Sequence, residues 1–227
     1  MRRRGVVSAL LVAVGGLAGG PVAADVPRAT IVLESFRATV PGQVAEAAPP
    51  RFVLLEDGTV FVGGAREVWS GRLGSAEAKA LEKRVEAMRK ITPLSGTVTL
   101  GPGPERRRLV LAKGKPADVR VEGATSASPP ALTLLAELVR DLEAFHHSSL
   151  RPYAPASYAL SAREGSLVGG CRAWTRPQKL ADAVFAPLVV PADVAEGWPT
   201  GASPAHVCVG DKSYVVTLRP LLPGERP

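Results

Sequence analysis

The feature that most constrains the fold is a hairpin signature in the stretch RFVLLEDGTVFVGG, residues 51–64. Asp57-Gly58 stands between two apolar runs, and Asp-Gly is a preferred two-residue turn between antiparallel strands. The strand pairs that follow from this turn are Leu55 with Val60, Leu54 with Phe61, and Val53 with Val62. The chain is therefore expected to contain antiparallel sheet.

Both faces of this predicted hairpin are apolar, whereas a half-buried strand alternates apolar with polar residues. One face would carry Val53, Leu55, Val60 and Val62. The other face would carry Phe52, Leu54 and Phe61, which together are a candidate binding surface. If helices cover the first face, the C-terminal part of the chain is the first candidate to cover the second.

Two amphipathic helices are predicted, each after a pair of strands. The first is SAEAKALEKRVEAMRK, with Ser75 as its N-cap, and the second runs from Ala131 to Phe145. Their apolar stripes are Ala78, Leu81, Val85 and Met88 in the first, and Leu135, Leu138, Leu142 and Phe145 in the second. The stretch RRLVLAKGKPADVRVEG, between the helices, predicts a second hairpin whose last strand alternates as at a sheet edge.

The order strand, tight turn, strand, helix thus occurs twice along the chain. A third hairpin is predicted to turn at Glu164-Gly165, and a last one at Gly210-Asp211 or Asp211-Lys212. No Rossmann-type alternation of strand and helix is present. The predicted fold class is α+β: an antiparallel sheet built from β-hairpins with two main amphipathic helices, in repeated strand-turn-strand-helix units.

The N-terminus has the layout of a secretory signal peptide. Arg2, Arg3 and Arg4 precede an apolar run, and Val22-Ala23-Ala24 supplies small residues before a cut between Ala24 and Asp25. Glycines in the apolar run weaken the alternative of an uncleaved membrane anchor, because they lower helix propensity and hydrophobicity. The expected location is exported, periplasmic or extracellular, by the general secretory or the twin-arginine route.

The predicted organisation is a signal peptide over 1–24, an α+β lobe over 25–148 and a C-terminal lobe over 149–227, packed as one globular unit. The full chain has a formal net charge of +7, and without the three signal arginines 25 basic residues face 21 acidic ones, a net of about +4. This modest charge, with 5% aromatic residues, does not indicate a nucleic-acid partner. The run Arg106 to Arg108 is more typical of a solvated sheet edge.

The two cysteines, Cys171 and Cys208, both lie in the predicted C-terminal lobe. An even pair in an exported chain predicts one disulfide. The alternatives are two free thiols or half of a metal site. Because only His206 lies nearby in the sequence, a metal would lack ligands.

Sequence motifs for catalysis are missing. The chain has no G-x-S-x-G elbow, no H-E-x-x-H, no phosphate loop and no G-x-G-x-x-G between a strand and a helix. We therefore name no catalytic residue and no cofactor.

The three histidines are His146, His147 and His206. The adjacent pair is predicted to end the second helix, where a favourable interaction with the helix dipole is simpler than a metal site. Adjacent helical residues also point about 100° apart, which does not suit one shared ion. No metal site is predicted.

The leading functional hypothesis is an exported, non-enzymatic envelope protein that binds a protein, a peptide or a surface polymer, with no membrane span after signal cleavage. One alternative is a secreted hydrolase whose site assembles only in three dimensions. A second is a protease inhibitor, with RPLLPGERP or the disulfide-linked region as its rigid exposed loop.

Overall fold

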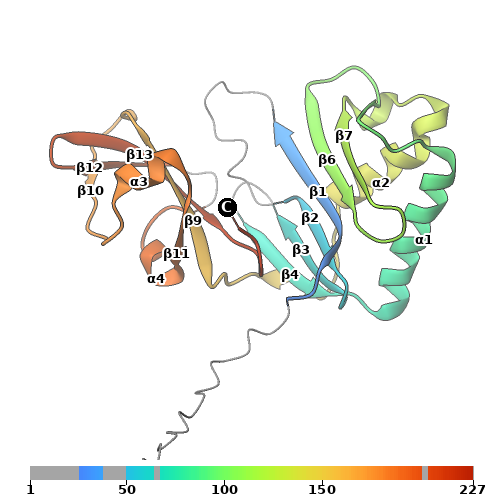
Figure 1. The fold of residues 1–227 in the computed structure, drawn as a ribbon, viewed down its shortest axis with the longest axis horizontal. Helices are drawn as coiled ribbons and strands as arrows, with labels where there is room; N and C mark the ends of the chain where they lie inside the picture. Colours follow the sequence, from blue (N-terminus) through green and yellow to red (C-terminus); the bar gives the residue numbers. More distant parts are fainter. Residues whose placement is uncertain (1–25, 38–49, 64–66, 201–203, 227) are drawn as a thin grey trace, which may run out of the picture.

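The structure is a computed structural model that describes residues 26–37, 50–63, 67–200 and 204–226. The predicted α+β class is confirmed, and the strands lie in two sheets that build two lobes (Figure 1). The predicted signal peptide and its cut between Ala24 and Asp25 fall outside the described residues. Within the described ranges, no helix is long and apolar enough to cross a membrane.

The N-terminal lobe is built on an eight-stranded sheet, here called sheet A. Its strands in spatial order are β5 (Thr97–Thr99), β7 (Ala117–Glu122), β6 (Glu105–Leu111), β1 (Ala29–Arg37), β2 (Phe52–Leu55), β3 (Thr59–Gly63), β4 (Val68–Arg72) and β8 (Arg151–Pro152). Neighbours are antiparallel except β5 and β7, which run parallel. The predicted second hairpin is β6–β7, and β5 extends the sheet beyond it.

Two long helices, α1 (Ser75–Ile91) and α2 (Thr133–Glu143), cover one face of sheet A (Figure 1). Short 3-10 turns, η2 (Thr125–Ala127) and η3 (Pro130–Leu132), precede α2. The predicted stripes bury Val85, Met88, Leu135, Leu138 and Leu142. The N-cap prediction was wrong by one residue. Gly74 is the cap, because the Glu77 carboxylate accepts a hydrogen bond from its N–H at 2.7 Å.

The hairpin β2–β3 forms as predicted, but its register differs by one residue. Leu54 faces Val60 and Val53 faces Phe61. Gly58 adopts φ +84° and donates its N–H to the Leu55 carbonyl at 3.1 Å, so the loop holds three residues and not two. A type I turn followed by a left-handed glycine is the usual three-residue hairpin loop.

This register overturns the candidate binding surface. Phe52 and Leu54 face the helices and are 0% and 1% exposed, and Phe52 packs edge-on against Phe145. Phe61 points to the opposite face and is 3% exposed. A one-residue slip moves a strand's side chains to the other face relative to its partner. The three residues are interior side chains on two faces, and not one open surface.

The C-terminal lobe contains a five-stranded sheet, sheet B. Its strands in spatial order are β10 (Arg172–Ala173), β12 (Ala205–Val209), β13 (Lys212–Pro220), β9 (Ser157–Glu164) and β11 (Leu188–Pro191). Only β10 and β12 run parallel. The helices α3 (Leu180–Phe185) and α4 (Ala192–Ala195) pack with one face of sheet B around Trp198.

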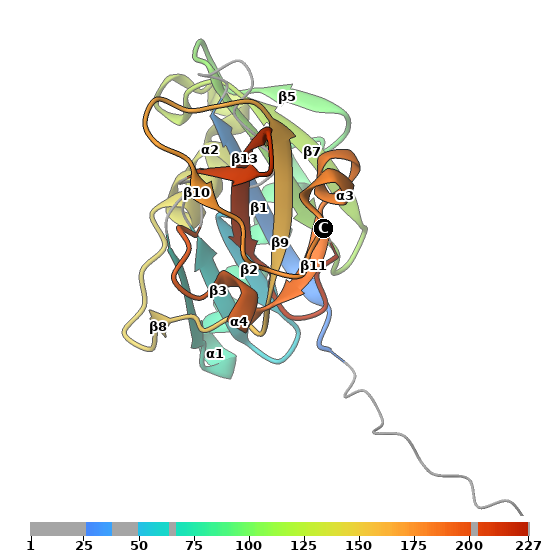
Figure 2. The same cartoon turned by 90° about the vertical axis from the view of Figure 1, so that its left-hand side faces the viewer.

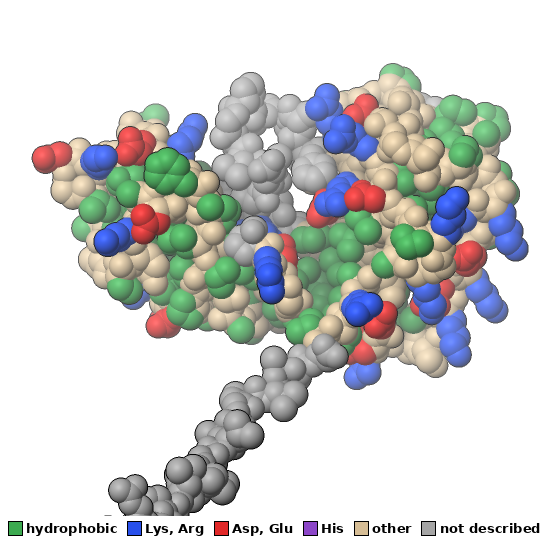
Figure 3. All heavy atoms as spheres, viewed as in Figure 1, with side chains coloured by type: hydrophobic (Ala, Val, Ile, Leu, Met, Phe, Trp, Pro, Cys, Tyr) green, Lys and Arg blue, Asp and Glu red, His purple; other side chains and the backbone are tan. Residues whose placement is uncertain are grey.

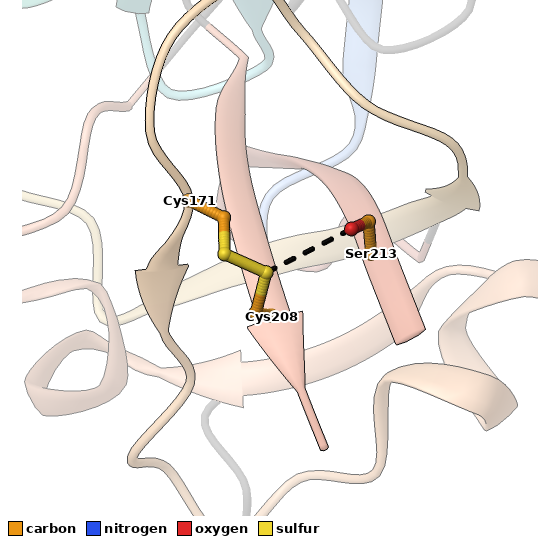
Figure 4. The surroundings of a disulfide bond; sticks show 3 residues. All are labelled: Cys171, Cys208 and Ser213. Carbon is orange, nitrogen blue, oxygen red and sulfur yellow. Dashed lines mark hydrogen bonds between the residues drawn. A yellow bond between two sulfur atoms is a disulfide. The ribbon is translucent and has the colours of Figure 1, made fainter. Parts of the chain in front are cut away.

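The final hairpin is confirmed, with Val209 facing Lys212 across the turn Gly210-Asp211. The hairpin predicted at Glu164-Gly165 was wrong, because β9 pairs with β13 and β11, which both come later in the chain. The predicted disulfide Cys171–Cys208 is present and joins the segment before β10 to β12 (Figure 4).

The end of the chain ties the two lobes together. After β13, Leu222 inserts among Val53, Leu55, Phe61 and Val68 on the face of sheet A that the helices leave open. In Figures 1 and 2 sheet B lies on this same side of sheet A, opposite α1 and α2. The expectation that the C-terminal part covers the second face of the opening hairpin is therefore confirmed for Phe61.

Candidate functional site

The structure brings together one set of side chains that resembles a hydrolase site. His147 Nδ1 lies 2.7 Å from Ser149 Oγ, and His147 Nε2 lies 3.1 Å from Glu77 Oε1. The glutamate comes from the first turn of α1, and the other two residues follow α2. A hydroxyl, an imidazole and a carboxylate in this order are the elements of a nucleophilic triad.

The surrounding bonds assign the single proton of the neutral imidazole to one of its two nitrogens. The Ser149 amide donates to Nδ1 at 3.2 Å, so Nδ1 accepts. The neutral ring then carries its proton on Nε2 and donates it to Glu77. The bond to the Gly74 N–H, and then the bond to His147, lower the pKa of the Glu77 carboxyl. The imidazole thus donates to the carboxylate and has its accepting nitrogen toward the serine, as in a catalytic triad.

The hydroxyl itself is not placed for attack. Ser149 Oγ accepts the Arg72 N–H at 3.0 Å and lies 3.1 Å from the Arg72 carbonyl oxygen. It also lies against the main chain of Gly71, where an added Cβ would come within 2.5 Å. A nucleophile needs open space for a substrate carbonyl and donors for the developing oxyanion. Ser149 instead joins β4 to the turn after α2.

Sequence reasoning missed this array because Glu77 stands seventy residues from His147. The only local signal was the His147-Ser148-Ser149 neighbourhood after a helix. The third residue, Glu77, contacts His147 only because α1 packs beside α2, and no sequence motif encodes that packing.

The arginine run at the start of β6 is largely neutralised. Arg107 is buried and bonds Glu143 at 2.6 Å, and Arg108 bonds Asp118 at 2.7 Å. Two of its three charges are thus committed to carboxylates of the same lobe. In Figure 3 basic and acidic side chains lie side by side over this lobe.

The histidines form no metal centre. His147 is held by Ser149 and Glu77, and His206 lies in β12, two residues before the disulfide cysteine Cys208. The described ranges contain no group of three or more His, Cys, Asp or Glu side chains that could hold a metal ion.

Two hollows lie along α1. One, of about 390 Å³, is lined only by residues of that helix. The other, of about 320 Å³, has Ile31, Val85 and Leu111 in its floor and the pair Lys113–Glu82 on its rim. Neither is lined by Ser149 or His147, so the triad-like array does not open into them.

The C-terminal lobe exposes apolar side chains close together in the chain. Phe185, at the end of α3, is 91% exposed, Val189 in β11 is 59% exposed, and Val184 is 38% exposed. Val184 and Phe185 belong to α3, whereas Val189 alternates with the buried Val190 and points to the other face of sheet B. We call these three residues, which lie around the β11 edge, the apolar docking surface. Hydrophobic side chains also reach the surface of this lobe in Figure 3. A fully exposed phenylalanine costs solvation free energy that a partner could recover.

Strand β11 is an edge of sheet B, and its free side is poor in donors. The C-terminal tail donates an N–H to Ser157 O at 3.0 Å, so this residue of β9 turns its main chain toward β13. Antiparallel bonding alternates, so Tyr158 turns toward β11, where it faces Val190. Val189 and Pro191 then direct their main chain outward.

Proline has no N–H, so Val189 supplies the one donor on the outward side of β11. Pro187, just before the strand, lacks a donor as well. Prolines on an edge discourage the addition of a further strand. A partner at this edge must therefore bind through side chains.

Two segments were candidates for the exposed loop of a protease inhibitor: RPLLPGERP and the disulfide-linked region. In the segment RPLLPGERP, Leu221 and Leu222 are only 2% and 8% exposed, whereas Pro223 and Gly224 form an exposed turn. The loop before Cys171 does expose Val168 completely. A Cβ at Gly169 or Gly170 would meet open space, so the side-chain positions of both glycines face solvent.

Comparison of the chain with protein-family models, with curated proteins and with solved structures finds no match. The function therefore has to be argued from the surfaces of the two lobes.

Proposed function

We propose that the protein is exported and acts as a non-enzymatic binding protein, which holds a folded partner protein on the apolar docking surface of Val184, Phe185 and Val189. The observation that carries this proposal is the 91% exposure of Phe185. Large aromatic side chains are frequent anchors of protein interfaces. The prolines beside Val189 favour a partner that contacts side chains over one that adds a strand.

Export is supported by two features of the chain. The first 24 residues have the pattern of a cleaved signal peptide. The disulfide Cys171–Cys208 suits an oxidising compartment such as the periplasm or the cell exterior. N-terminal sequencing of the exported protein should begin at Asp25, and a start at Met1 would remove the cleavage claim.

The binding proposal is tested by a photo-crosslinking residue placed at position 189. We expect a discrete adduct in envelope fractions, and we expect Phe185→Ser to reduce its yield about tenfold, as for loss of an interface anchor. The matched control is Val209→Ser, because Val209 is also a half-exposed valine on sheet B, at 46%. It should leave the yield within about twofold.

Equal losses in both variants would argue against a specific surface. A concentration-dependent dimer that Phe185→Ser abolishes would replace the partner protein with a second copy of this chain. Sedimentation of the purified protein separates these outcomes.

The hydrolase alternative makes a different prediction for Ser149. Because the Arg72 main chain occupies its hydroxyl, we expect no labelling of the purified protein by a fluorophosphonate serine probe. Ser149→Ala should cost about 1 kcal/mol of stability, the usual value for a lost hydrogen bond. Mass-spectrometric detection of the probe on Ser149, lost in Ser149→Ala, would restore the hydrolase as the leading function.

A further inference from the structure

We propose that Arg172 and Arg176 form a second binding site, for the phosphate or carboxylate groups of an anionic polymer. The site lies at the β10 edge of sheet B, whereas the apolar docking surface lies at the β11 edge. The two sites share no residue, so either one can fail without the other.

The first arginine is held rigidly. Cys171, the residue before it, is bonded to Cys208 (Figure 4), and Arg172 itself pairs with Val207 in β12. Its guanidinium carbon lies 4.2 Å from the centre of the Trp198 ring. Stacking of this kind is favourable and fixes the plane of the guanidinium.

Trp198 in turn packs against a second tryptophan, with an angle of 55° between the ring planes. The ring of Trp198 lies 5.0 Å from that of Trp174, whose indole N–H donates to the Gln178 carbonyl at 2.8 Å. Trp198 is 7% exposed, so the platform under Arg172 is part of the core. A rigid platform lowers the entropy cost of ordering the arginine when a ligand binds.

Neither guanidinium is neutralised. Arg172 Nη1 donates to the Gly197 carbonyl and Arg176 Nη2 to the Glu196 carbonyl, each at 2.8 Å. Within the described residues, these are the hydrogen bonds that the two side chains make, and neither has a carboxylate within 4.0 Å. Both guanidinium groups therefore lie at the turn between α4 and β12, and the Glu196 carboxylate of that turn is not within 4.0 Å of either.

Donors remain for a ligand. A guanidinium carries five N–H donors in a planar fork, and Arg172 uses one of them. The Nε of Arg176 is buried and has no hydrogen-bond partner in the described part of the chain. Because this atom is closed to solvent, a ligand would bind the Nη groups of Arg176 and not its Nε.

The chemistry of the ligand follows from these donors. Planar guanidinium forks match the oxygens of phosphate and carboxylate groups. The nine residues from Cys171 to Lys179 include three basic side chains and no acidic one. A chain with repeated negative charges can therefore contact Arg172 and Arg176 together, because the two arginines bond adjacent carbonyls, of Gly197 and Glu196. The shared chemistry is an oxyanion, supplied either by a phosphate-bearing or by a carboxylate-bearing polymer.

The rival explanation is purely structural: the two arginines hold the 196–198 turn against the β10 segment. Loss of either arginine would then lower the stability of the lobe and leave any affinity for polyanions unchanged. The test therefore measures affinity and stability separately.

The probes are polyphosphate and polygalacturonate, titrated calorimetrically into the full-length exported protein at low ionic strength, where charge pairs are least screened. The fluorescence of Trp174 and Trp198 serves as a second readout. We expect saturable binding that weakens with added salt. Binding of only one probe would assign the site to phosphate or to carboxylate.

The variants are Arg172→Gln and Arg176→Gln. Each should raise Kd about tenfold, which corresponds to one charge-assisted hydrogen bond. The matched control is Arg106→Gln, an exposed arginine of the N-terminal lobe with the same change in charge. It should change Kd less than about twofold. Arg172→Lys keeps the charge but loses the fork, and should give an intermediate, several-fold loss.

The wild-type protein provides a measurement that needs no variant. Phenylglyoxal modifies accessible arginines, and bound polyphosphate should protect Arg172 and Arg176 but not Arg106. No binding of either probe at low ionic strength would overturn the proposal. Equal effects of Arg106→Gln and Arg172→Gln would overturn it too, as would a loss of stability in Arg172→Gln with unchanged affinity.

Discussion

The two lobes differ in the size of their apolar cores and in the apolar side chains that they expose. Among the described residues, the main core cluster of the N-terminal lobe has nineteen buried side chains, between sheet A and two long helices. The main cluster of the C-terminal lobe has eleven described members, beneath helices of six and four residues. Its largest exposed apolar residues include Phe185 at 91% and Val168, which is fully exposed.

Charge divides the lobes less cleanly. Both lobes pair cations with carboxylates, as in Arg107–Glu143 of the N-terminal lobe and Arg219–Glu225 of the C-terminal lobe. Among the described residues of the C-terminal lobe, Arg172 and Arg176 bond only main-chain carbonyls. A lobe with the larger core beside one that displays apolar groups and these two arginines favours a division into scaffold and binding module. Binding sites commonly lie on parts that a rigid scaffold positions.

The largest expected effect tests whether the smaller core depends on its disulfide. The bond closes a loop with a sequence separation of 37 residues. Loop-closure entropy for that length corresponds to about 4 kcal/mol. The double variant Cys171→Ser/Cys208→Ser should therefore lose about 3–4 kcal/mol in the C-terminal lobe. Chemical unfolding followed by tryptophan fluorescence measures this loss.

The N-terminal lobe provides the control for that measurement. Its helical signal in circular dichroism comes mainly from α1 and α2, which the disulfide does not touch. If both signals shift together to the same midpoint, the lobes unfold as one unit and do not differ in stability. Separate midpoints would confirm that the lobes differ in stability.

Local patterns predicted much of the N-terminal lobe. The stripes at spacings of three and four placed both helices, because a helix that covers a sheet must bury one face. The turn at residues 56–58 was located correctly. Its length was not, because Asp-Gly suits both two- and three-residue loops, and one residue decides which face Phe61 occupies.

The C-terminal lobe was less predictable, for a physical reason. Strand β9 pairs with β13 and β11, far along the chain, while proximity in sequence suggested a hairpin at Glu164-Gly165. Non-local pairing leaves no turn signature. The candidate surfaces share this difficulty: the exposure of Phe185 and the stacking of Arg172 on Trp198 depend on tertiary packing alone.

A second prediction tests the contact between the lobes. Leu222 is 8% exposed and packs among Val53, Leu55 and Phe61 of sheet A. Leu222→Ala should cost about 2 kcal/mol, the low end for a leucine truncated in a core, because its site is at an interface. The matched control is Leu134→Ala in α2, where the leucine is 37% exposed and the cost should stay below about 0.5 kcal/mol.

Thermal unfolding followed by two probes measures this coupling. Trp69 reports on the N-terminal lobe, and Trp174 with Trp198 on the other. We expect Leu222→Ala to separate the two transitions. Unchanged, coincident transitions would show that the C-terminal tail contributes little to the contact.

The smallest expected effect concerns the link between Glu77, His147 and Ser149, which stabilises only the N-terminal lobe. The bonds from the Gly74 N–H and from His147 lower the folded-state pKa of the Glu77 carboxyl below its unfolded value. A lowered folded-state pKa means that the carboxylate contributes stability above the unfolded pKa, about 4.3, and that this contribution is lost as the pH falls through the folded pKa. Glu77→Gln should therefore be less stable than wild type at neutral pH, and the difference should shrink toward about pH 3. Urea unfolding at both pH values measures it, with the exposed turn residue Glu56→Gln as the control. A difference that stays constant with pH would mean that Glu77 acts through packing and not through its charge.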